Sequence, residues 1–162
     1  MKASRYVITA VILIWVCAGM QQGVASKLSI FGASPDYLLV AACILGLLTE
    51  TRSALIVGFC VGIAHSAIVG ESMWQFVVTR MLAAWICAFL VESRFQRNFG
   101  SAAVATLGCT LVSGLLFMII APQPNITGTL TATIIKAVYN GVLAMVVYIP
   151  IERAAGVRSQ QL

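Results

Sequence analysis

Apolar residues run along the chain in long blocks that are separated by short polar segments. A helix of roughly 20 residues crosses a hydrocarbon core of about 30 Å. The blocks therefore predict an all-α integral membrane protein, a compact bundle of about six transmembrane helices. Because the second and third blocks are short, they fit helices packed inside the bundle, helices with another tilt, or spans whose ends lie a few residues further out. The predicted spans are residues 6–25, 35–48, 53–69, 73–91, 101–121 and 126–149.

Composition supports a single polytopic membrane domain over residues 1–162. Hydrophobic residues make up 60% of the chain and charged residues only 9%, and the mean hydropathy is +0.99. Almost nothing is left over for a water-soluble domain. Runs such as AVILIWVCAGM lack the alternation of polar and apolar residues that a transmembrane β-strand needs, so the spans are predicted to be helical.

Lysine and arginine predict the orientation of the bundle. With a cytoplasmic N-terminus, the outer loops hold only Lys27. This bias predicts a bacterial inner-membrane protein with both termini in the cytoplasm. The basic residues behind the net charge of +5 are then expected to set the orientation in the membrane and to contact anionic lipids. The sequence shows no basic face that would bind nucleic acid. The inner segments hold Lys2, Arg5, Arg52, Arg94, Arg97, Arg153 and Arg158.

The first block has one alternative, a cleaved signal peptide, because basic residues precede it and Val16 and Ala18 form a passable cleavage pattern. We expect it to be retained, since the apolar block becomes a full transmembrane span when residues 23–25 are counted.

The cysteines form no CxxC pair or Cys/His cluster, so no metal or other cofactor is predicted, and they are expected to be small core residues. One lies in each of the first five spans: Cys17, Cys43, Cys60, Cys87 and Cys109.

Small residues recur every fourth position in the third span, which places them on one stripe of a helix. Such a stripe lets another helix approach closely. It serves either packing within the bundle or the binding of a partner protein. The stripe consists of Ala54, Gly58, Gly62 and Ser66.

Two basic residues fall inside predicted spans, where a charge is costly. At 1.5 Å per residue, Arg80 lies about 10 Å and Lys136 about 15 Å from the outer ends of their helices. Either could extend its side chain toward the outer surface. We expect them to pair with an acid such as Asp36 or Glu71 and lock the bundle, or to form a site for a partner or an anion, such as a lipid phosphate in the outer leaflet.

Asp36 lies at the outer end of the second span. Ser34-Pro35-Asp36 also predicts a helix start, with serine as N-cap and proline at the first helical position. Capping and ion pairing can coexist at Asp36.

His65 and Ser66 are neighbours in sequence and point about 100° apart on a helix, so they do not form a catalytic pair. A membrane hydrolase is therefore not favoured, and no catalytic residue is predicted.

Three stretches, taken in order, resemble the MreD family of bacterial rod-shape-determining proteins: FGASPDYLLVAACILGLL, ALIVGFCVGIAHSAIVG and YNGVLAMVVYIPIER. The resemblance covers about residues 31–153. The first family motif, P-D or P-N before an apolar run, matches Pro35 and Asp36. The third, an asparagine followed by a small residue and an apolar run, matches Asn140 and Gly141.

The second family motif reads G-F-x-x-G-x-x-x-D. Gly58, Phe59 and Gly62 match it, whereas Ser66 stands in the acidic position. Trp74 stands where the family often has glycine. These departures affect any role that needs a carboxylate in the third span, and not the fold.

The resemblance implies a non-enzymatic membrane component of the cell-elongation machinery, which synthesises peptidoglycan. Its implied partners are MreC and, with it, the elongation-specific penicillin-binding transpeptidase, the RodA glycosyltransferase and, indirectly, MreB filaments. The small-residue stripe is then the expected groove for the single transmembrane helix of MreC. The family is also similar in fold to the S components of energy-coupling-factor transporters, so a vitamin-binding S component is the alternative function.

Overall fold

The computed structural model describes residues 3–30, 32–70, 73–93, 96–120 and 125–156. These residues form six helices and no strand, only an isolated bridge between Ile30 and Ala33. The predicted all-helical fold is therefore confirmed for this part of the chain. The helices are α1 Ala3–Gly23, α2 Tyr37–Leu47, α3 Thr51–Val69, α4 Met73–Glu92, α5 Phe99–Ile120 and α6 Ile126–Ala155.

Five of the helices are long and apolar enough to cross a membrane, and α2 is the exception. Its 11 residues extend about 16 Å at 1.5 Å per residue, well short of a bilayer core of about 30 Å. The predicted six spans are thus corrected to five long helices and one short helix. The chain has the architecture of a multi-pass membrane protein.

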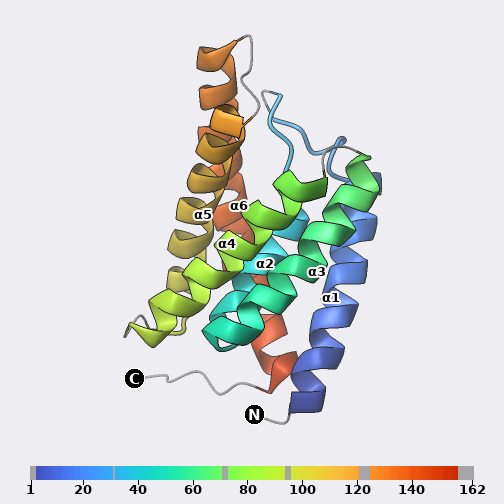
Figure 1. The fold of residues 1–162 in the computed structure, drawn as a ribbon, viewed down its shortest axis with the longest axis vertical. Helices are drawn as coiled ribbons and strands as arrows, with labels where there is room; N and C mark the ends of the chain where they lie inside the picture. Colours follow the sequence, from blue (N-terminus) through green and yellow to red (C-terminus); the bar gives the residue numbers. More distant parts are fainter. Residues whose placement is uncertain (1–2, 31, 71–72, 94–95, 121–124, 157–162) are drawn as a thin grey trace.

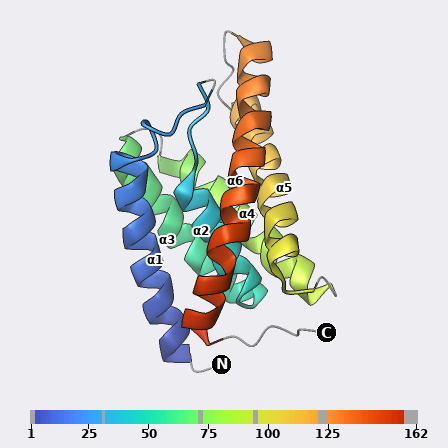
Figure 2. The same cartoon turned by 180° about the vertical axis from the view of Figure 1, so that it is seen from behind.

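Helix α2 forms the core of the bundle. Every one of its residues is buried, and all five other helices contact it (Figures 1 and 2). Because it has no exposed face, its sequence is apolar all round and shows no helical periodicity. Of the arrangements expected for this short block, packing inside the bundle is the one observed.

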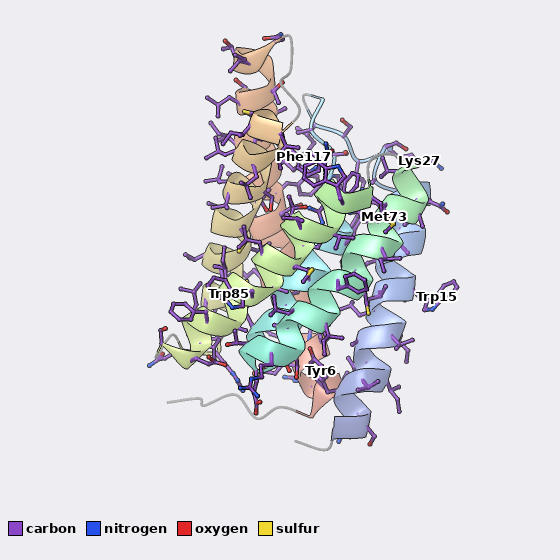
Figure 3. The ribbon with its side chains drawn as sticks, viewed as in Figure 1. Tyr6, Trp15, Lys27, Met73, Trp85 and Phe117 are labelled. Carbon is purple, nitrogen blue, oxygen red and sulfur yellow. The ribbon has the colours of Figure 1, made fainter. Side chains whose placement is uncertain are left out.

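The long helices turn apolar side chains outward. Trp15 of α1 is 76% exposed, and Figure 3 shows it projecting away from the other helices. Ile56, Ile119 and Val146 are similarly exposed on α3, α5 and α6. Such surfaces suit a lipid environment, because lipid tails solvate apolar side chains as well as a protein core does.

Helix α6 continues past its predicted end at residue 149. Pro150 lies inside the helix, which runs on to Ala155. A proline removes one backbone hydrogen bond, and a transmembrane helix tolerates this where its surroundings compensate. Here Tyr148 donates a buried hydrogen bond of 3.2 Å to Glu152, across the proline.

The start of α1 and the end of α6 lie at the same end of the bundle (Figure 1). Arg5 donates a hydrogen bond of 3.4 Å to the carbonyl of Ala154. Lys27 and Phe117 lie at the opposite end, away from Tyr6 (Figure 3). The short helix α2 begins inside the bundle, and its first turn positions the polar residues described next.

Candidate functional site

Asp36 stands immediately before α2 and caps it. Its carboxylate accepts a hydrogen bond of 2.9 Å from the backbone N–H of Leu39. The predicted helix start was therefore correct in position but wrong in detail, because Asp36, and not Ser34, is the N-cap. Pro35 consequently precedes the cap and is buried. An aspartate side chain at this position satisfies one of the free N–H groups of the first turn.

Arg80 of α4 forms an ion pair with the same carboxylate. Its Nη2 lies 2.6 Å from Oδ2 of Asp36, and the two side chains are 2% and 4% exposed. Nη1 donates to the hydroxyl of Thr79 at 3.1 Å. The guanidinium also lies 5.6 Å from the ring centroid of Phe76, within the range of a cation–π contact. The expected pairing of Arg80 with Asp36 is thus observed.

His65 and Lys136 complete a group that we call the Asp36 cluster: Asp36, His65, Arg80 and Lys136. Nζ of Lys136 lies 3.6 Å from Oδ2 of Asp36, and Nδ1 of His65 lies 3.6 Å from Oδ1. Nη2 of Arg80 contacts the same Nδ1 at 3.1 Å. Because a guanidinium can only donate, Nδ1 is the acceptor, which leaves the imidazole neutral. The cluster then holds two positive charges and one negative charge. Glu71, the other predicted partner, lies outside the described residues.

Asn140 of α6 ties the start of α2 to α5. Its Oδ1 accepts a hydrogen bond of 2.9 Å from the backbone N–H of Asp36, and its Nδ2 donates to the hydroxyl of Thr110 at 3.2 Å. Gln21 of α1, which sequence reasoning did not single out, accepts from the N–H of Tyr37 at 3.0 Å. A polar residue near the end of an apolar block was the only available signal for it.

Residues from two of the three stretches quoted above meet at this cluster, together with a neighbour of the motif position in the other. The first motif supplies Asp36, the third supplies Asn140, and His65 stands next to Ser66 in the acidic position of the second. Ser66 itself donates to the carbonyl of Ile63 at 2.9 Å, so its hydroxyl is not directed at a histidine base. The third span therefore contributes an imidazole to the cluster from position 65, one residue before the position at which the family motif has its acid.

The remaining motif residues have packing positions. Phe59 is 45% exposed and faces outward from α3. A Cβ at Gly141 would lie 3.2 Å from the carbonyl oxygen of Ala103, so this glycine permits close contact between α6 and α5. Neither residue reaches the Asp36 cluster.

The small-residue stripe lies beneath α4. A Cβ at Gly58 would stand 2.6 Å from Cα of Met81, and one at Gly62 would stand 2.5 Å from Cα of Val77. Ala54 and Ser66 are buried as well. The expected groove for a partner helix is therefore filled by this chain's own α4, and the stripe serves packing within the bundle.

Three cysteines from different helices come together in the core. The sulfurs of Cys43, Cys87 and Cys109 all lie within 4.8 Å of one another, and those of Cys87 and Cys109 are 3.7 Å apart. The sequence analysis missed this group because its members lie 22 or more residues apart. All three are buried, as expected for small core residues, whereas Cys60 is exposed.

A cavity of about 370 Å³ adjoins the Asp36 cluster. It has apolar walls at Phe76 and Phe117, and all four cluster residues line it. Phe117 places it at the end of the bundle away from Tyr6 (Figure 3). Further polar lining residues are Gln21, Thr110, Ser113, Thr129 and Thr133.

Within the described residues, Arg80, which lines this cavity, carries a buried donor without a hydrogen-bond partner, its Nε. A buried, unpaired N–H of a charged group is unfavourable. The cavity is therefore lined by two basic residues and one acidic residue, and one of the basic residues carries an unpaired donor.

No protein-family model, no curated protein and no solved structure matches the chain. The function is therefore inferred from the residues and contacts described above.

Proposed function

We propose that this protein is a non-enzymatic membrane scaffold of the bacterial cell-elongation complex, of the MreD type. The observation that carries the proposal is that Asp36 of the first motif meets Asn140 of the third, while His65, beside the acidic position of the second, joins the Asp36 cluster. Asp36 binds Asn140 through its backbone N–H and approaches His65 through its carboxylate.

The cluster gives the scaffold a rigid centre. It joins α2, α3, α4 and α6 through charged and polar contacts at one buried point. Contacts of this kind, made by side chains from several helices to one carboxylate, favour one arrangement of the core over alternatives. A bundle held in this way can present a constant outer surface to the membrane helix of MreC.

That partner surface lies on the outward faces of the bundle, because α4 covers the small-residue stripe. Through MreC the scaffold acts on the elongation-specific transpeptidase and RodA, and indirectly on MreB filaments. It resides in the inner membrane with both termini in the cytoplasm. The distribution of basic residues and the shared position of the two helix ends support this orientation (Figure 1).

Affinity purification of the tagged protein from its native membrane, followed by mass spectrometry, tests the proposal. We expect recovery of a single-span coiled-coil protein together with cell-wall synthases. An unrelated multi-pass protein with the same tag is the control for non-specific capture. Recovery of a transporter's energising subunit and its ATPases would overturn the scaffold in favour of a transport function.

One observation favours a second candidate, a substrate-binding S component of an energy-coupling-factor transporter. The cavity beside the Asp36 cluster has a volume within the range of about 300–1,000 Å³ that is common for small-molecule sites. Polar groups from several helices converge on it. A thermal-shift screen with a panel of vitamins tests this candidate, and stabilisation by one vitamin at micromolar concentration would support it.

A further inference from the structure

We propose that the cavity beside the Asp36 cluster binds a singly charged oxyanion, held between Arg80 and Lys136. The shared chemistry is that of a phosphodiester or a carboxylate. The source is either the headgroup of an anionic phospholipid or a small anion from water. The site is independent of the scaffold function, which requires no ligand.

The charge balance of the cluster calls for such a ligand. Arg80 and Lys136 both face the carboxylate of Asp36, and His65 accepts a hydrogen bond as a neutral ring. One positive charge is left over, shared between the buried guanidinium of Arg80 and the ammonium group of Lys136, whose side chain is 37% exposed. Uncompensated charge at such a site is costly. A bound monoanion would neutralise it.

No other described acid lies close enough to do so. Glu50 directly precedes α3 and Glu92 ends α4, so both stand at the end of the bundle where α1 begins. Glu152 follows Pro150 near the end of α6, on that same side. Asp36 is thus the only described carboxylate among the residues that line the cavity.

The free donors show where the anion binds. Arg80 is 2% exposed, and its Nε has no partner within the described residues. Lys136 has three ammonium protons, and the structure gives it a single ion-pair partner, Asp36, among the residues that it describes. Both residues line the cavity. An oxyanion there could accept from the guanidinium and the ammonium group together, which is a strong, charge-assisted arrangement.

The cavity also suits a headgroup in size and surroundings. About 370 Å³ is enough for a phosphodiester or a small carboxylate, but not for whole acyl chains. The walls combine polar groups with the rings of Phe76 and Phe117. Helices α4 and α5 diverge toward this end of the bundle (Figure 1), and residues of both line the cavity. A lipid could therefore place its headgroup inside while its chains remain in the bilayer.

The test measures binding to the purified full-length protein in a zwitterionic detergent. The probes are a short-chain phosphatidylglycerol, the matching phosphatidylcholine, and inorganic phosphate. We expect phosphatidylglycerol to bind and phosphatidylcholine to bind at least tenfold more weakly. Competition by inorganic phosphate alone would identify a water-soluble anion as the source, and its failure to compete would identify the lipid headgroup.

Lys136→Gln is the decisive variant, because Lys136 is partly exposed and Arg80 still neutralises Asp36 in its absence. We expect it to weaken phosphatidylglycerol binding at least tenfold. Lys27→Gln, which changes an exposed lysine at the same end of the bundle, is the matched control and should bind as the wild type does. Arg80→Lys retains the charge and removes Nε, and it should also bind more weakly.

Three results would overturn the proposal. They are the absence of binding by either anion, equal binding of phosphatidylcholine and phosphatidylglycerol, and binding that Lys136→Gln leaves unchanged. A melting temperature for each variant shows whether it is folded. Because neither MreC nor a synthase is needed, failure of this test leaves the scaffold proposal standing, and the reverse also holds.

Discussion

Nη2 of Arg80 and Oδ2 of Asp36 lie 2.6 Å apart, although 44 residues separate them in the sequence. The carboxylate caps α2 with one oxygen and binds the guanidinium with the other. One buried side chain therefore both begins the central helix and attaches it to α4. The following predictions test this arrangement and the packing around it.

Removing one partner of the pair should destabilise the protein strongly. Arg80→Ala leaves the carboxylate of Asp36 buried with a weaker partner, and breaking a buried pair costs about 3–5 kcal/mol. Arg52→Ala, at an exposed arginine of α3, is the control and should change stability by less than about 0.5 kcal/mol. Thermal unfolding in detergent measures both.

The double variant Asp36→Asn/Arg80→Gln should be less destabilised than the sum of its single variants, because neither charge is left unpaired. Asparagine also keeps the side-chain oxygen that caps α2. Simple additivity of the two effects would contradict a direct pairing between these residues.

Asn140 should contribute more to stability than its partner Thr110. Asn140→Leu deprives the N–H of Asp36 of its acceptor in the core, which costs about 1–3 kcal/mol. Thr110→Val keeps the side-chain shape and removes the hydroxyl that accepts from Asn140, with a loss of about 0.5–1.5 kcal/mol. Chemical unfolding of the two variants gives the comparison, and a larger loss for Thr110→Val would contradict the hydrogen-bond arrangement.

Two glycine-to-alanine changes should act in opposite directions. Gly58→Ala places a Cβ 2.6 Å from Cα of Met81 and should destabilise the bundle by about 1–3 kcal/mol through overpacking. Gly108→Ala in α5 meets no atom within 4 Å of the described structure and should be neutral or stabilise by up to about 1 kcal/mol.

Co-purification assays with the Gly58→Ala variant separate packing from partner binding. We expect the yield of folded protein and the recovery of partners to fall together, because the stripe contacts α4. A variant that folds with the wild-type melting temperature and loses its partners would show instead that the stripe binds them.

Reporter fusions test the proposed orientation. A fluorescent protein fused after Gly156 should mature in the cytoplasm, and alkaline phosphatase inserted after Ser29 should be active outside. The basic residues near the start of α1 and the end of α6 favour this outcome, since only Lys27 opposes them. Active phosphatase after Gly156 would reverse the assignment.

The sequence by itself determined that the chain is helical and belongs in a membrane. Long apolar blocks with few charges are a local property, and in lipid the backbone must form its hydrogen bonds within each helix. The predicted ranges consequently agree with the helices to within a few residues, apart from α6. There the predicted span ends at residue 149, directly before Pro150, and the helix continues to Ala155.

The tertiary structure alone decided how these helices use their polar and small residues. Hydropathy could not show that α2 is a buried core element, because an apolar stretch looks the same whether lipid or protein surrounds it. Nor could spacing show that Asp36 meets Arg80 and Asn140, or that three cysteines converge. Those contacts join residues 22 to 104 positions apart, and they depend on how the helices pack against one another, which no local pattern records.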